Sequence, residues 1–222
     1  SRAPPPAGRT RSPVRSTMYA LERTVRVDRW WSRTAVAAPF LGDRLGYPAP
    51  KPRHWTGVMT DDDSASRGTP VYTKLRHMLL DMNADALNLD PSRRGPVWGV
   101  MIEFGVDDAT VTLVGLADDT TSLYTSTGGG MIGAGFHEQV AVATRNLLSV
   151  VTAHLPDIPR SDDQSLPADG RWVIRALTDS GHHAVNVAEP NLRSGQHPLS
   201  PVYRAAHGVI TELRLLDEAR QQ

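Results

Sequence analysis

Apolar and polar positions follow clear periods only after about residue 68. Apolar residues recur at helical spacing in three stretches, residues 69–82, 137–155 and 200–219. The first stretch opens with Thr and Pro, which favour the N-cap and the first helical position. We therefore expect three amphipathic helices, with these residues on their apolar faces: Val71, Leu75, Met78, Leu79 and Met82; Val140, Thr144, Leu147, Leu148 and Val151; Tyr203, Ala206, Ile210 and Leu213.

Five short stretches rich in β-branched and aromatic residues predict strands. Residues 97–105, 109–117 and 121–127 are separated by short turns that contain Asp, which predicts an antiparallel meander. Residues 171–178 and 183–189 flank the turn DSGH and predict a hairpin. The order of elements predicts an α+β fold, a five-stranded antiparallel sheet with three helices packed on its faces. We expect the middle helix on one face and the first and last helices together on the other.

The first part of the chain shows neither period. Residues 1–58 are rich in Arg, Pro, Ser and Ala, which predicts an irregular extension, followed by a single α+β domain at 59–222. Met59 opens a polar, acidic stretch that is typical of the start of a bacterial protein, so we expect it to be the native start. The alternative is a basic arm that binds nucleic acid. In that arm phosphate contacts and base stacking would come from Arg29, Trp30, Trp31 and Arg33.

The charges are divided unevenly between the two parts. Residues 1–60 carry 11 Lys and Arg against 3 Asp and Glu, a net charge of +8, and the rest of the chain carries 13 against 21, a net charge of −8. An acidic domain repels nucleic acid, so any such affinity must come from the arm. The chain has no cysteine, which excludes disulfides, thiolate metal sites and a cysteine nucleophile. No apolar run approaches the ~20 residues of a membrane helix, and no signal-peptide pattern is present, so we expect a cytoplasmic protein without membrane contact.

A glycine-rich loop joins the third expected strand to the second helix. Residues 121–140 hold five of the 18 glycines, and three of these match the dinucleotide pattern G-x-G-x-x-G. The preceding strand belongs to a meander rather than a βαβ unit, which argues against a nucleotide site. Two alternatives stay open. The loop is a packed corner that buries Met131 and Ile132, or it is a small-anion or phosphate site built by Ser126, Thr127, Gly128, Gly129, Gly130, Gly133, Gly135 and His137.

Other candidate chemistry is weak. The acidic pairs fall in expected turns, where Asp is a turn former. His182 and His183 lie in the expected turn beside Asp179, which we expect to be solvated. Adjacent residues on a strand point to opposite faces, which argues against a shared metal ion. No G-x-S-x-G nucleophile motif is present. We therefore expect no catalytic residues, no metal and no cofactor.

The order of elements across residues 69–217 resembles the profilin-like sandwiches, which include the roadblock family of bacterial GTPase regulators and dynein light chains. Roadblock domains usually place two strands before the middle helix and three after it, whereas here three precede it and two follow. The resemblance therefore concerns architecture alone and carries no site residue. The loop at residues 122–135 also resembles one found in uncharacterised bacterial proteins, and this likeness implies no activity.

The leading hypothesis is a small bacterial protein that acts as a non-catalytic interaction or regulatory module. It would contact a protein partner or a second copy of itself, in part through the edges of its sheet. One alternative is an anion-binding domain or enzyme that uses residues 128–135. The other is nucleic-acid binding through the basic arm.

Overall fold

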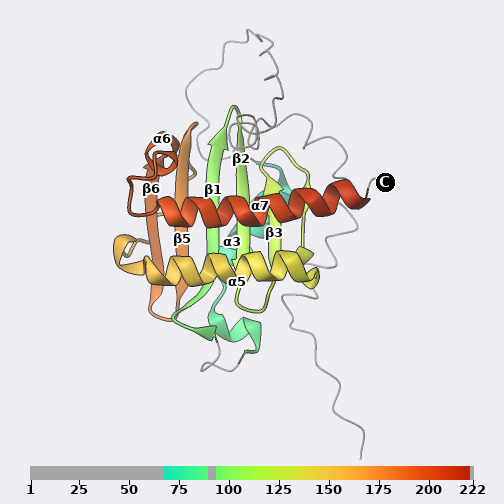
Figure 1. Ribbon diagram of the computed structural model, residues 1–222, viewed down its shortest axis with the longest axis horizontal. Coiled ribbons are helices and arrows are strands. Elements are labelled where there is room, and N and C mark those ends of the chain that lie inside the picture. Colours follow the sequence, from blue (N-terminus) through green and yellow to red (C-terminus); the bar gives the residue numbers. More distant parts are fainter. Residues whose placement is uncertain (1–67, 90–93, 221–222) are drawn as a thin grey trace, which may run out of the picture.

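A six-stranded antiparallel sheet with the order β4–β3–β2–β1–β5–β6 forms the centre of the protein. The computed structural model describes residues 68–89 and 94–220 (Figure 1). The predicted extension at residues 1–58 and the arm residues Arg29, Trp30, Trp31 and Arg33 lie outside these ranges. The α+β class and the antiparallel sheet predicted from the sequence are confirmed, with one strand more than expected.

The predicted meander and hairpin are both present. Their ends differ from the predicted ones by a few residues at most, and the additional strand β4 comes from the glycine loop. None of the helices in the described ranges is both long and apolar enough to cross a membrane. The elements are α3 (Pro70–Leu80), η2 (Ala84–Leu87), β1 (Val97–Val106), β2 (Ala109–Leu116), β3 (Thr121–Thr125), β4 (Gly130–Met131), η3 (Ala134–Phe136), α5 (Glu138–Ala153), η4 (Leu155–Asp157), β5 (Arg171–Thr178), β6 (Gly181–Ala188), α6 (Glu189–Arg193) and α7 (Ser200–Arg220).

Helices α5 and α7 cover one face of the sheet side by side (Figure 1). Their apolar faces are buried as predicted and share one core with the strand residues of that face. The prediction that the first and last helices lie together is wrong. The short helix α6 follows β6 directly and turns the chain back on the side of α5, where Leu192 and Leu199 join the same core.

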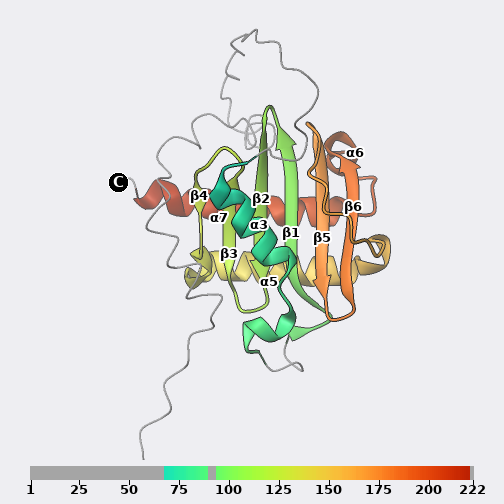
Figure 2. The same ribbon diagram turned by 180° about the vertical axis from the view of Figure 1, so that it is seen from behind.

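Helix α3 packs against the opposite face (Figure 2). Thr69 caps it as predicted, and Leu75 and Leu79 are buried. The predicted apolar face is wrong by a fraction of a turn, because Val71 is 37% exposed while Tyr72 and Arg76 are buried. Arg76 can be buried because a carboxylate of the sheet neutralises it, and a pattern of apolar positions cannot show this.

A segment without regular structure, residues 160–169, crosses the same face beside α3. We call it the strap. It begins with a bridge between Arg160 and His183 on the outer edge of β6, and it ends with a bridge between Asp169 and Gly105 on β1. The strap therefore occupies part of the edge of β6, which we expected to be available for pairing with another chain.

The stability of the fold should depend on pH through His207, which packs on α7 against the rings of Trp172 and Tyr203. Burial lowers the pKa of His207 below its ordinary value of about 6.5, and the charge of Glu189 opposes this effect. The unfolded chain then binds the proton more readily, so the free energy of unfolding should fall as the pH falls through about 6.5. Urea denaturation at about pH 7.5 and about pH 5.5 measures this fall, which the variant His207→Phe should reduce. Equal losses in the variant and the parent protein would contradict the assignment.

Candidate functional site

The glycine loop forms a packed corner between β3 and α5. Met131 is 5% and Ile132 is 4% exposed, and the two side chains enter the cores on opposite faces of the sheet. Gly130 and Met131 form β4, which pairs with Leu123 and Tyr124 of β3. The burial that the packed corner predicted is confirmed, and this packing orders the loop without a ligand.

The hydroxyl groups predicted for an anion site do not face a common space. The Ser126 side chain is buried, and its Oγ accepts a hydrogen bond from the Thr110 amide at 2.9 Å. Thr127 and Gly128 are exposed at the tip of the loop. The Gly129 carbonyl accepts a hydrogen bond from the main chain, so this part of the loop is bonded to β3.

The second half of the loop is equally occupied by the protein itself. The Gly133 amide donates to Ser122 Oγ at 3.1 Å, and Gly135 lies directly against the main chain of Asp119. His137, partly exposed, caps the start of α5 without a side-chain hydrogen bond to the helix. An anion site at residues 126–137 stays a prediction that none of these contacts favours.

The side chains with the most extensive polar contacts lie beneath α3. Glu103, fully buried in the middle of β1, accepts hydrogen bonds from Arg76 Nε at 2.8 Å and from Arg76 Nη2 at 3.1 Å. Arg175 of β5 also donates to this carboxylate, through Nη1. Tyr72 donates its hydroxyl to Glu103 Oε1 at 3.2 Å. We call Tyr72, Arg76, Glu103 and Arg175 the Glu103 network.

The Glu103 network also holds the strap. Arg76 Nη2 donates to the carbonyl of Gln164, and Arg175 Nη2 donates to the carbonyl of Ser165 at 2.7 Å. Three chain segments that are far apart in the sequence, α3, the sheet and the strap, are therefore joined through one carboxylate. The residues involved are at most 6% exposed, apart from the strap itself, so this network is a structural connection without an open face for a ligand.

The ionisation of the network follows from its burial. Burial raises the pKa of the Tyr72 hydroxyl, and the charge of Glu103 adds to this, so Tyr72 remains a donor. Burial lowers the pKa of Arg175, against the opposing charge of Glu103. A guanidinium group keeps its proton in proteins, so Arg175 remains charged. Two guanidinium groups thus share one carboxylate in the interior.

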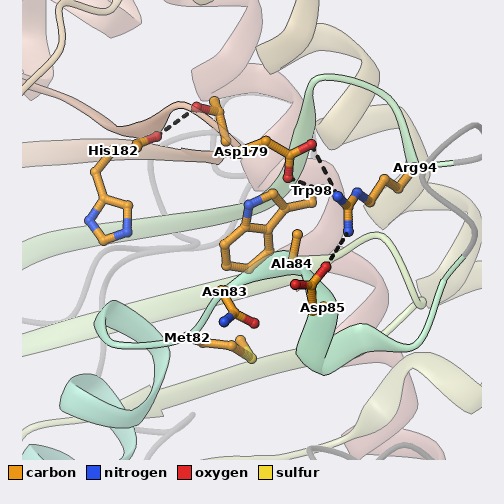
Figure 3. Close-up of a pocket in the computed structure, with 10 residues that line it drawn as sticks. Met82, Asn83, Ala84, Asp85, Arg94, Trp98, Asp179 and His182 are labelled. Atoms are coloured by element: carbon orange, nitrogen blue, oxygen red, sulfur yellow. Dashed lines mark hydrogen bonds and ion pairs between the residues drawn. The ribbon is translucent and has the colours of Figure 1, made fainter.

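A hollow of about 530 Å³ opens at the end of the same face, where η2 approaches the turn between β5 and β6 (Figure 3). Residues 82–85 form one side, and Asp179 and His182 form the other. Arg94, which precedes β1, and Trp98, near the start of β1, lie between them (Figure 3). Its volume is within the range of about 300–1,000 Å³ that is typical of ligand sites.

Arg94 is the central polar group of the hollow. Its side chain is only 7% exposed, and Nη2 lies 3.0 Å and 3.1 Å from the two carboxylate oxygens of Asp179. Asp85 is 3.8 Å from Nη1, too far for a hydrogen bond. Nε and Nη1 of Arg94 are buried and have no hydrogen-bond acceptor among the residues that the structure describes. A buried donor without an acceptor costs on the order of 1–3 kcal/mol. A ligand that supplied an acceptor to Arg94 would remove this cost.

A β-bulge places Trp98 in the hollow. Along β1, Val97 pairs with Thr178 and Gly99 pairs with Leu177, so Trp98 is the additional residue. The bulge turns Trp98 toward the face of α3, where its ring is 2% exposed and packs in the core beneath α3. Bulges of this kind redirect a side chain and are frequent beside functional sites.

Sequence reasoning did not find the hollow. Its residues come from three separated segments, and none of them has a motif. The turn with Asp179 is predicted to be solvated, and Asp179 is exposed there. Its carboxylate also binds Arg94, and His182 lines the hollow. His183 points to the other face, as predicted, and its Nδ1 is 2.7 Å from the carbonyl of Ile158. Among the described residues no group of three or more His, Asp or Glu side chains could hold a metal ion.

Two glycine substitutions should separate packing from backbone strain in the loop. A Cβ atom at Gly135 would lie 1.5 Å from the Asp119 carbonyl oxygen, whereas at Gly128 the nearest atom is 3.7 Å away. Gly135→Ala should therefore lower the free energy of unfolding by about 3 kcal/mol or more. Gly128→Ala has space but a φ of +94°, and should cost about 1–2 kcal/mol. Chemical denaturation measures both, and equal costs would contradict a packed corner.

Removal of the shared carboxylate of Glu103 should strongly lower the free energy of unfolding. Glu103→Leu leaves two buried guanidinium groups without their partner and should cost about 3–5 kcal/mol in urea denaturation. The triple variant Arg76→Met, Glu103→Leu, Arg175→Met removes all three charges and should recover most of that loss. A triple variant as unstable as the single one would show that the charges are not the cause.

Comparisons with protein families, with curated proteins and with solved structures found no match to this chain. The functional interpretation therefore depends on the geometry of the protein itself. Within the described ranges, the hollow around Arg94 combines concave shape, a buried unsatisfied donor and a redirected aromatic side chain.

Proposed function

We propose that the protein is a non-catalytic binding module that recognises a polypeptide segment of a partner in the hollow around Arg94. The observation that carries this proposal is the buried guanidinium of Arg94, whose Nε and Nη1 have no hydrogen-bond acceptor in the described part of the chain. A main-chain carbonyl of a bound segment would supply that acceptor once a small movement of the Arg94 side chain opens these buried atoms to the hollow. The gain would be on the order of 1.5–3 kcal/mol, as for other hydrogen bonds to a charged group.

The other groups of the hollow support recognition rather than reaction. The Thr178 hydroxyl donates to the Gly181 carbonyl at 2.6 Å, so it is engaged within the turn. Asp179 holds Arg94 through both of its oxygens. Each of these side chains is held in place by a partner within the protein, an arrangement that suits complementarity with a ligand. A nucleophile held by a general base would require a different arrangement.

The edges of the sheet offer less to a partner than the hollow does. At one edge β4 has only two residues, Gly130 and Met131. At the other edge the Ala184 amide donates to the Pro159 carbonyl, and the His182 carbonyl accepts from Ser161. These bonds occupy the positions that an added strand would use over that part of β6. The hollow is therefore the better candidate for the contact with a partner.

Selection of peptides tests this proposal. A library of random 12-residue linear peptides displayed on phage is selected against the full chain, and the Kd of each selected peptide is measured by calorimetry. Arg94→Lys keeps the charge beside Asp179 but removes the planar set of donors, so it should weaken binding about tenfold or more. The control is Arg145→Lys on α5, an arginine on the other face that also pairs with two carboxylates, those of Asp119 and Glu138, but whose side chain is 49% exposed.

Arg145→Lys should leave the Kd unchanged within about twofold, and thermal unfolding should show that both variants are folded. Peptides that bind the Arg94 variant as tightly as the parent protein would contradict the proposal. A selection that yields no binding peptide would also contradict it.

A further inference from the structure

We infer that the segment bound in the hollow is basic, with a lysine or arginine side chain placed beside Asp85 and Asp179 and a main-chain carbonyl on Arg94. This inference rests on the proposed function and names the chemistry of the partner. The first argument is the balance of charge. Arg94 contributes one positive charge and the two aspartates contribute two negative charges, so among the described residues the ionic groups of the hollow leave one negative charge over.

Asp179 and Asp85 differ in how closely they contact Arg94. Both oxygens of Asp179 bind the same nitrogen of Arg94, and its side chain is 57% exposed. Asp85 makes only the longer contact of 3.8 Å with Nη1, and its side chain is 89% exposed. The carboxylate of Asp85 therefore has free capacity to accept hydrogen bonds from a second cation at the mouth of the hollow.

The same arrangement disfavours an anionic ligand. A carboxylate or phosphate that satisfied Arg94 Nε would come close to Asp179 and Asp85, and such a like-charge approach costs several kcal/mol in the general case. A neutral carbonyl oxygen accepts the same hydrogen bond without this repulsion. The free donors of Arg94 thus select for a main-chain carbonyl, and the free acceptor at Asp85 selects for a cation nearby.

The apolar part of the hollow suits the stem of a long basic side chain. Trp98 and Met82 line it together with Ala84 (Figure 3). Lysine and arginine bury their methylene groups along apolar surfaces while the charged end stays at the solvent. The surroundings add to the preference, because residues 61–222 carry a net charge of −8 and attract basic segments from a distance.

The test uses the peptides selected from the random library, whose composition is not biased toward any charge. Each Lys or Arg of the tightest peptide is replaced by Gln, and the Kd is measured against the full chain and against Asp85→Asn. At least one replacement should weaken binding to the parent chain about tenfold. It should weaken binding to Asp85→Asn much less, because the partner of that cation is already absent.

Asp108→Asn is the matched control. It removes the same charge from the exposed turn between β1 and β2, at the end of the sheet opposite the hollow. In this control the Lys or Arg replacement should weaken binding as much as in the parent chain. A coupling that is equal for Asp85→Asn and Asp108→Asn would overturn the inference, because the attraction would then come from the general field.

The outcomes separate this inference from the proposed function. Basic peptides whose affinity depends on both Arg94 and Asp85 would support both. Neutral or acidic peptides whose affinity depends on Arg94 would overturn the basic partner and leave the binding module intact. Peptides whose affinity depends on neither residue would overturn both.

Discussion

A single buried carboxylate, that of Glu103, holds α3 and the strap against the sheet. A charge in the interior is tolerated only when it is paired and hydrogen-bonded. Glu103 meets this condition with Arg76 from α3 and Arg175 from β5, and the same two arginines bind carbonyl groups of the strap. Movement of α3 or of the strap away from the sheet would leave buried charges unpaired. The positions of both segments are thereby coupled to the centre of β1.

The location of the hollow depends on this coupling. Helix α3 ends at Leu80, and the chain then continues directly into η2, where Asn83 Oδ1 accepts from the Ala86 amide and fixes the turn. Residues 82–85 are one side of the hollow, so their place is set by where the network holds α3. The opposite face, covered by α5 and α7, is built around a large apolar core. Shape and polarity that suit a ligand are therefore concentrated on the face of α3.

The sequence predicted what depends on local patterns. Strands β1, β2 and β5 follow from their β-branched residues, and the buried face of α5 was predicted correctly because it packs mainly on the apolar core. The face of α3 was not, since the burial of Arg76 depends on Glu103, which lies 27 residues away. The placement of α7 beside α5 depends on the direction in which α6 turns the chain. No periodicity contains that information.

The hollow was beyond sequence reasoning for the same reason. Asp85, Arg94 and Asp179 are ordinary surface residues in their local context. The pairing of β1 with β5 brings Arg94 to Asp179, and the placement of α3 and η2 brings Asp85 to them. The bulge that redirects Trp98 is a property of register and has no signature in the residues themselves. The glycine loop has a recognisable sequence pattern, but packing explains it better than a ligand does. Position 135 needs glycine because a side chain there would collide with the main chain of Asp119.

The most direct test is the ¹⁵N NMR spectrum of the arginine side chains during titration of the full chain with a selected peptide. The account predicts that the Arg94 Nε–H resonance shifts and becomes protected from exchange with water as its hydrogen-bond acceptor arrives. Arg175 provides the internal control, because its Nε is also buried without a hydrogen-bond acceptor within the described ranges but belongs to the closed Glu103 network. Its resonance should not move. An unchanged Arg94 resonance at saturation with the peptide would contradict the central claim that this guanidinium receives the bound segment.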